Sequence, residues 1–296
     1  PVWDGNETWL ILGGGGLFAA FPLAYAVLMP AFYIPVLIML AALIFRGVAF
    51  EFRHKAVRKP TRLFWNGAFA YGSLTAALAQ GFILGGFIQG VEVEGRSYAG
   101  GAFDWFTPFS VLVALSVAGG YVLLGSCWLV LKTEGETQMG SRKWARRAMI
   151  FVILAMGAVS LATLSIDPRV TERWGLNMEA LEFGKFLTLA PIPMIAMILF
   201  FFLWRDIWIR VEDAPDWRPM VYAAAIFLTG YLGLAISLFP NLVPFELDIW
   251  ETAARDNALM LMFVGAAIML PVILGYTIYV YSLFWGKVDP DEAYHD

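Results

Sequence analysis

Long uncharged apolar stretches alternate with short polar segments along the whole chain. Eight stretches lack Asp, Glu, Lys, Arg and His, and a bilayer core of about 30 Å needs about 20 such residues in a helix. They are Thr8 to Leu28, Met29 to Phe45, Leu63 to Val91, Trp105 to Leu131, Ala148 to Ile166, Phe186 to Trp204, Pro219 to Phe245 and Asn257 to Trp285. Because unpaired backbone groups are not tolerated in lipid, the pattern predicts an all-α integral membrane protein, a polytopic bundle of eight transmembrane helices.

Only the surroundings of Pro30 separate the first two stretches. A single helix over both would be far too long for a bilayer. Pro22, Pro30 and Pro35 also interrupt the pattern, because proline removes a helical hydrogen bond. We therefore expect a tight helical hairpin in this region.

Glycines recur inside the apolar stretches, where small residues let helices approach closely. Gly13 to Gly16 form the densest run, and no Lys-Ser or Lys-Thr pair follows, so a phosphate-binding P-loop is excluded. Further glycines lie at helical spacing at Gly81, Gly85, Gly86, Gly119, Gly120 and Gly125. We expect close helix packing at all of these positions.

Composition agrees with a membrane protein. The 296 residues are 60% hydrophobic and 15% charged, with a mean hydropathy of +0.69, which is outside the range of soluble domains. The net charge of -4 argues against a nucleic-acid partner. The single cysteine, Cys127, excludes an internal disulfide and a multi-cysteine metal or iron-sulfur site, and we interpret it as a small buried apolar residue.

Basic residues predict the orientation. If each of the eight stretches crosses the membrane once, the connecting segments alternate between its two sides. Fifteen of the twenty Lys and Arg then lie on the side of Pro1 and Asp296, and five lie on the other. The positive-inside rule places the first side, with both termini, in the cytoplasm. We expect the Pro-flanked segment 239–244 to form a bend or re-entrant turn at the outer surface.

Histidine is scarce. His54 and His295 are the only two, and both lie in polar segments, so the chain offers no intramembrane imidazole pair for haem or a metal. The eight stretches also contain no ionisable group of the kind that ion-coupled carriers keep near the midplane. A secondary transporter or channel therefore remains only an alternative, because we find no matched pair of interrupted helices.

The first ten residues form a dense cluster of acidic, amide and indole groups that leads directly into an apolar stretch. On a helix, Asp4 and Glu7 share one face, and Trp3 and Trp9 flank them as interfacial rings. Two interpretations stay open. A carboxylate at this boundary could relay protons, or Asp4 or Asn6 could cap the helix, whose dipole favours acids at its start.

Three motifs resemble subunit II of the cytochrome bd-type quinol oxidases, including the cyanide-insensitive branch. They are Trp3-Asp-Gly-Asn-Glu-Thr-Trp9, Gly14-Gly-Gly-Leu-Phe-Ala-Ala-Phe-Pro22 and Phe45-Arg-Gly-Val-Ala-Phe-Glu-Phe-Arg53. The first two, in this order and at this distance, are the more specific. The similarity continues through the spacing of the later helices, so it covers essentially the whole chain.

The resemblance implies a non-haem subunit of a bacterial inner-membrane oxidase that reduces O2 to water with electrons from ubiquinol. Haems b and d would belong to the partner, subunit I, and no cofactor or metal is expected in this chain. The resemblance is also compatible with a quinone as a structural ligand and with a small single-helix third subunit. The family has nine transmembrane helices, the first before the Trp-Asp-Gly-Asn motif. We therefore expect residues 1–296 to form one transmembrane domain that is incomplete at its N-terminus.

Two site residues follow from the resemblance. Asp4 corresponds to an aspartate on a cytoplasmic proton route toward the haem site of subunit I. Trp9 corresponds to a tryptophan near the start of an apolar O2 path, and an interfacial anchor stays open for it. Glu7 receives no role. A purely structural scaffold is a third hypothesis, in which changes at Asp4 and Trp9 would act only through assembly.

Overall fold

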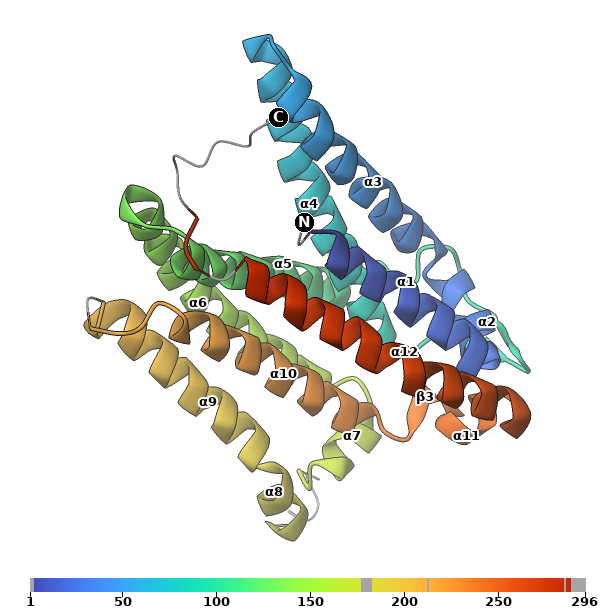
Figure 1. The fold of residues 1–296 in the computed structure, drawn as a ribbon. Helices are drawn as coiled ribbons and strands as arrows, with labels where there is room; N and C mark the ends of the chain where they lie inside the picture. The colour runs from blue at the N-terminus through green and yellow to red at the C-terminus, as the bar shows by residue number, and fades with distance from the viewer. Residues whose placement is uncertain (1–2, 177–182, 212, 285, 289–296) are drawn as a thin grey trace.

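The computed structural model describes residues 3–176, 183–211, 213–284 and 286–288 of the chain. Within these residues the fold is helical, apart from two small β-hairpins. Figure 1 shows long helices packed side by side, with the pair α3 and α4 projecting beyond the rest.

The elements follow in chain order. The helices are α1 (Trp3–Ala20), α2 (Pro22–Ala31), α3 (Tyr33–Lys55), α4 (Lys59–Gln89), α5 (Pro108–Lys132), α6 (Gly135–Thr163), α7 (Pro168–Arg173), α8 (Phe183–Leu189), α9 (Pro191–Trp204), the π-helical turn η1 (Arg205–Ile209), α10 (Arg218–Leu238), α11 (Ile249–Thr252) and α12 (Asp256–Leu283). The antiparallel hairpins are β1 (Val93–Glu94) with β2 (Ser97–Tyr98), and β3 (Asn241–Val243) with β4 (Leu247–Asp248).

Seven of the described helical segments are long and apolar enough to cross a membrane. Six correspond to the last six predicted stretches, and the seventh is α3. The prediction of an unbroken helix from Thr8 to Leu28 is wrong, because the helix breaks at Phe21, whose backbone is not helical (φ −134°, ψ 63°). The following Pro22 explains the break, since proline disfavours the helical conformation of the residue before it.

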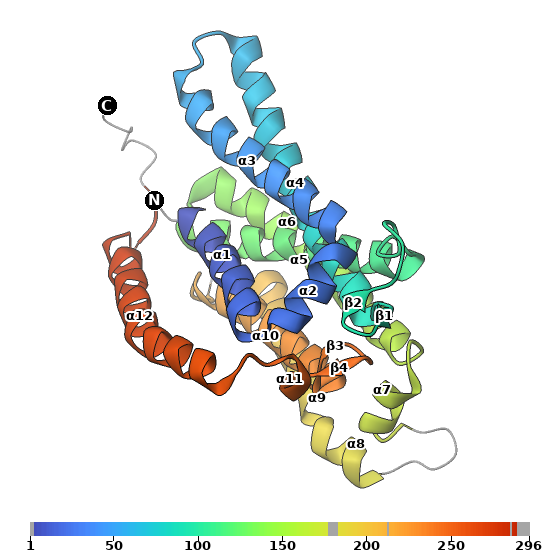
Figure 2. The same cartoon turned by 90° about the vertical axis from the view of Figure 1, so that its right-hand side faces the viewer.

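The second predicted stretch is displaced along the chain. Its helix, α3, begins at Tyr33 instead of Met29 and continues to Lys55, so Arg46 and Arg53 lie on the helix itself and not in a loop. Figure 2 shows α1 and α3 running in opposite directions, with the short α2 between them. The chain therefore reverses here as expected, but through a separate ten-residue helix.

Two apolar cores hold the bundle together. One joins α5, α6, α9, η1 and α10 around buried residues that include Leu123, Met149 and Leu203. The other packs α2 against Trp105 and against Val243 of β3. The Pro-flanked segment 239–244, expected as a bend or re-entrant turn, contains β3 of the second hairpin.

Glycines set the distance between α4 and α5. A Cβ added at Gly85 would come within 2.5 Å of Ser110 Cα, and one at Gly81 would overlap the backbone of Ala114. Gly119 and Gly120 likewise leave room for aromatic rings of neighbouring helices. Close packing at these positions is confirmed, whereas a Cβ at Gly125 would meet no described atom within 4 Å.

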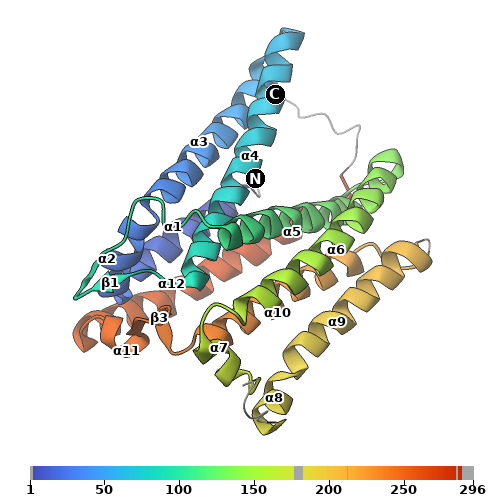
Figure 3. The same cartoon turned by 180° about the vertical axis from the view of Figure 1, so that it is seen from behind.

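The connections between long helices lie alternately on two opposite sides of the bundle, with the α3–α4 turn at the tip of its projecting pair (Figures 1 and 3). We call one the terminal end, formed by residues 56–58, 133–134, 213–217 and 286–288. We call the other the hairpin end, formed by residues 90–107, 164–176 and 239–255, which include both β-hairpins, α7 and α11. This alternation is the one expected of a chain that crosses a bilayer repeatedly.

Candidate functional site

The two residues predicted from sequence lie on the same helix, α1. The Trp9 side chain is 41% exposed. The backbone of Asp4 is part of α1. The side chains of residues 3–7, including that of Asp4, lie outside the described part of the structure. Whether Asp4 caps the helix or faces a proton route therefore stays a prediction.

The rest of α1 presents an open face. A Cβ added at any of Gly13 to Gly16 would meet no described atom within 4 Å, so the expected close packing at this run is wrong within the described chain. Among the described elements, α1 packs mainly against α2 and α12. Phe18 is exposed apart from an edge contact with Tyr25. Trp9 and the glycines thus lie on a helix surface that the described residues leave largely uncovered.

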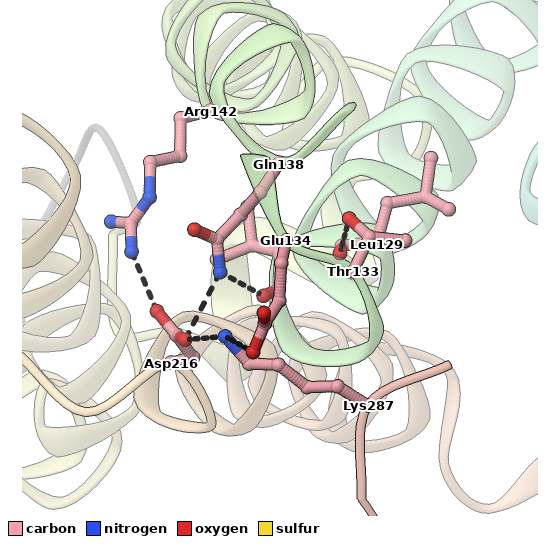
Figure 4. A network of polar contacts seen from close by, with 8 residues as sticks. Leu129, Thr133, Glu134, Gln138, Arg142, Asp216 and Lys287 are labelled. Atoms are coloured by element: carbon pink, nitrogen blue, oxygen red, sulfur yellow. Dashed lines mark hydrogen bonds and ion pairs between the residues drawn. The ribbon is translucent and has the colours of Figure 1, made fainter. Parts of the chain in front are cut away.

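A charged cluster occupies the terminal end, where Asp216 accepts contacts from three side chains (Figure 4). Its carboxylate lies 2.6 Å from Arg142 Nη2 on α6 and 2.7 Å from Lys287 Nζ, beyond α12. Gln138 donates a further hydrogen bond of 3.0 Å to it. Glu134 approaches Lys287 Nζ to 3.5 Å. The cluster therefore joins the α5–α6 turn, the segment before α10 and the segment after α12.

The same end is closed by backbone contacts. Lys132 Nζ donates to the carbonyl oxygens of Phe284 (2.6 Å) and Gly286 (3.1 Å), and the amide of Val288 donates to the carbonyl of Lys132 (2.8 Å). The pKa of Lys287 is raised, chiefly by its hydrogen bond to Asp216. These contacts fix the end of α12, although none of the residues of α12 is buried within the described chain.

Sequence reasoning missed Asp206, which lies just beyond the predicted stretch that ends at Trp204. The residue is fully buried on η1, and its Oδ1 pairs with Arg205 Nε at 3.1 Å. Its Oδ2 has no hydrogen-bond partner in the described structure. The available signal was that no Gly or Pro follows Trp204 until Pro215, so the helix can continue beyond the apolar run. The π-helical turn, a feature often found at functional positions, then directs the carboxylate inward.

A small polar cavity of about 230 Å³ lies at the hairpin end, between α2, α4 and the start of α5. Tyr98 and Asp104 line it, and the Tyr98 hydroxyl donates to Asp104 Oδ2 (3.0 Å). Burial and the neighbouring Asp104 raise the pKa of Tyr98 to about 12. This phenol therefore stays neutral near pH 7.

Histidine and cysteine side chains do not come together in the described residues. His54 lies exposed near the end of α3, with its ring 5.7 Å from that of Phe50, while His295 lies outside the described residues. Cys127 is buried as predicted. Across residues 3–176, 183–211, 213–284 and 286–288, no group of three or more His, Cys, Asp or Glu side chains could hold a metal ion.

Known proteins match this chain along its whole length. The chain is 28% identical to cytochrome bd-I ubiquinol oxidase subunit 2 of Escherichia coli (strain K12), over 99% of this chain and 83% of that protein. It is also 28% identical to cytochrome bd ubiquinol oxidase subunit 2 of Bacillus subtilis (strain 168), over 99% and 84%.

The fold agrees with these sequence matches. A chain of the bd oxidase structure from Geobacillus thermodenitrificans superposes with a TM-score of 0.72 at 17% identity, covering 96% of this chain and 83% of that one. The sequence model of the family described as cytochrome bd terminal oxidase subunit II matches residues 1–284. The chain therefore belongs to the cytochrome bd terminal oxidase subunit II family.

Proposed function

We propose that this chain is the non-haem subunit of a bacterial inner-membrane oxidase that oxidises ubiquinol and reduces O2 to water. The single observation that carries the proposal is the family match over residues 1–284. The names of its relatives, which describe ubiquinol oxidase subunits, supply the substrate class. Residues 1–296 would form one domain of the complex.

Haems b and d would supply the electron-transfer and oxygen chemistry in the partner, subunit I. The presence of only two histidines in the sequence, both in polar segments, supports this division of labour. The exposed faces of α1 and α12 are surfaces that such a partner could cover. A small single-helix subunit and a structurally bound quinone are compatible with the same surfaces.

The optical spectrum of the complex tests this assignment. A complex purified through a tag on this chain should show bands of b and d haems together with quinol oxidase activity. The same chain isolated alone should show neither. Haem bands in the isolated chain, or solute flux through vesicles that contain only this chain, would instead favour an independent cofactor protein or a transporter.

Within the complex, we assign Asp4 to proton supply from the cytoplasm. Its backbone lies in the first turns of α1, next to an apolar run in which an ionisable group is retained only at a considerable energetic penalty. A carboxylate at this boundary can cap the helix or relay protons, and the family resemblance of the Trp-Asp-Gly-Asn motif supports the relay.

An Asp4→Asn variant tests the proton role. Removing a positioned proton-transfer group typically slows a reaction by about a hundredfold or more, so quinol oxidase turnover and proton uptake should fall together. Glu7→Gln, on the same face of α1, is the matched control and should keep its turnover. Full activity of Asp4→Asn in an assembled complex would leave only the helix-cap role.

For Trp9 we propose a place beside the path by which O2 reaches the partner. Support comes from its 41% exposure on a helix face that the described residues leave largely uncovered. Trp9→Leu should change the rate of O2 binding several-fold without changing the amount of assembled complex. Trp217→Leu, at an exposed tryptophan of the terminal end, is the control. Unchanged O2 kinetics would reduce Trp9 to an interfacial anchor.

We also propose eight crossings, with Pro1 and Asp296 on the cytoplasmic side. The 18 residues of α1 span about 27 Å at 1.5 Å per residue, close to the thickness of a bilayer core. Together with the seven longer apolar helices, α1 would make the eighth crossing and place the terminal end in the cytoplasm.

A further inference from the structure

A second, larger cavity lies at the hairpin end, away from α1 and from the charged cluster of the terminal end. Its volume is about 500 Å³, within the range of about 300–1,000 Å³ that small-molecule sites occupy. Figure 3 shows its walls, α7, α8, the end of α10 and the second hairpin, gathered in one region. The lining residues are Arg169, Glu172, Arg173, Lys185, Ser237, Leu238, Phe239, Pro240, Asn241 and Phe245.

Positive charge predominates in this lining, with three cationic side chains and one acidic one. Arg169 is held in place by Asp167, with Nε–Oδ1 and Nη2–Oδ2 distances of 3.0 Å. Its Nη1 also donates to the carbonyl of Phe245 (2.9 Å), and the guanidinium lies 5.0 Å from the centroid of that ring. Arg169 is therefore a positioned guanidinium in the cavity wall, and Asp167 balances part of its charge.

Two further donors in the lining have no partner among the described residues. Arg173 and Asn241 are both half-buried, yet within the described part of the chain neither side chain makes a hydrogen bond, and Arg173 makes no ion pair. Their donor atoms are not among the buried polar atoms that lack a partner, so both side chains are accessible from the cavity. Ser237 is already engaged, since its hydroxyl donates to Gly233 O (2.7 Å) and accepts from Trp174 Nε1 (2.9 Å). The two donors are therefore available to an acceptor inside the cavity, and the charge of Arg173 favours an anion.

The opposite wall is apolar. Leu238 is buried, Phe239 is 51% exposed, and the exposed Trp250 contacts the Phe239 ring edge-on at 6.4 Å. On the neighbouring α8, Phe183 and Leu187 are 70% and 62% exposed. Exposed aromatic rings beside basic groups at the end of apolar helices are typical of the membrane–water boundary. A ligand for this site therefore combines an anionic group with hydrocarbon.

We propose that this cavity binds the phosphate of a membrane phospholipid headgroup. Arg173 and Asn241 donate hydrogen bonds to the phosphate oxygens, the positioned guanidinium of Arg169 lies in the adjoining wall, and the acyl chains lie along the exposed apolar surface of α8 and the end of α10. Arginine suits this role because its planar donor fork matches the geometry of phosphate.

Lipid binding to the intact, delipidated complex tests the proposal. Native mass spectrometry would follow titration with phosphatidylglycerol, with diacylglycerol of the same chains as the phosphate-free probe. We expect Arg173→Gln to raise the dissociation constant for phosphatidylglycerol at least about tenfold, as loss of charge-assisted hydrogen bonds does. Arg173→Lys should restore part of this affinity. Diacylglycerol should bind weakly to both the unmodified complex and Arg173→Gln.

Arg210→Gln is the matched control, because Arg210 is an exposed arginine at the opposite end of the bundle. It should leave the dissociation constant unchanged. Asn241→Ala gives an independent second variant, and equal elution volumes of all complexes would show that assembly is intact. Equal phosphatidylglycerol affinity of Arg173→Gln and the unmodified complex would overturn the proposal. So would full competition by millimolar inorganic phosphate, or occupation of the cavity by a side chain of the partner subunit.

Discussion

At the scale of single residues, Asp206 shows how strongly burial changes a charged group. Its carboxylate has an exposed fraction of 0%, whereas its partner Arg205 keeps 27% of its side chain exposed. Arg205 also lies over the ring of Phe202 at 5.0 Å. A buried charge of this kind is tolerated because a cation is adjacent, so the pair should behave as a unit.

An Arg205→Met variant should destabilise the folded chain by about 3 kcal/mol, because it keeps the apolar stem but leaves the Asp206 carboxylate buried without a cation. The free energy of unfolding can be measured by titrating the protein with a denaturing detergent. The double variant Arg205→Met with Asp206→Asn should recover most of this loss. Equal stability of the single and double variants would show that the two side chains do not interact.

Asp167 gives a pH dependence at the hairpin end. Its pKa is lowered, chiefly by the hydrogen bond from Arg169. The ionised form therefore stabilises the folded state above the unfolded pKa of about 3.9, and this contribution is lost as the pH falls through the lower folded pKa. Hydrogen exchange at the Arg169 amide, which donates to Asp167 Oδ1 at 2.8 Å, should show less protection at pH 3 than at pH 5. Asp167→Asn should remove the difference.

At the scale of elements, α12 is a membrane helix held mainly at its ends. None of its residues is buried within the described chain. Near its start the amide of Ala254 donates to Ala20 O (2.8 Å), and after its end Lys132 and Asp216 hold residues 284–288. Between these points Tyr281 contacts Trp128 edge-on. The charged cluster therefore decides whether the end of α12 stays on the bundle.

Asp216→Asn should loosen this attachment, because it removes the ion pairs to Arg142 and Lys287 together. Losing charge-assisted hydrogen bonds typically costs about 1.5–3 kcal/mol. We expect trypsin cleavage after Lys287 to become at least about tenfold faster, since about 1.4 kcal/mol corresponds to a factor of ten. Asp213→Asn, at an exposed aspartate of the same connection, should cleave at the unmodified rate. Equal rates for both variants would assign the attachment to Lys132 alone.

At the scale of the whole molecule, the two ends of the bundle differ in charge. The terminal end and its adjoining helix ends carry most of the basic residues, while the hairpin end carries few, including Arg96 and Arg169. This asymmetry motivates the proposed orientation, with the terminal end in the cytoplasm.

Labelling with a membrane-impermeant maleimide tests the orientation. Cys127 is the single cysteine and is buried, so a Cys127→Ala background has no competing thiol. Arg96→Cys, in the β1–β2 turn, should react in intact spheroplasts. Arg58→Cys, between α3 and α4, should react only after the membrane is opened. The reverse pattern would invert the proposed topology.

Much of the helical architecture could be predicted from local sequence. The stretch Leu63 to Val91 became α4 (Lys59–Gln89), and Asn257 to Trp285 became α12 (Asp256–Leu283). These boundaries were readable because charged and turn-forming residues cannot enter lipid without partners. The family motifs near Trp3 and Gly14 were equally local, and the match over residues 1–284 agrees with them.

Tertiary contacts decided the rest. Asp216 meets Arg142, 74 positions away, and Lys132 meets Gly286, 154 positions away, and no periodicity in the sequence encodes such pairings. Gly85 and Gly13 look alike in the sequence, yet one faces Ser110 and the other faces open space within the described chain. The sequence by itself determined which segments enter the membrane, because transfer into lipid depends on local apolarity. Only the tertiary structure decided which polar groups are buried, paired or left available, because that depends on which helices become neighbours.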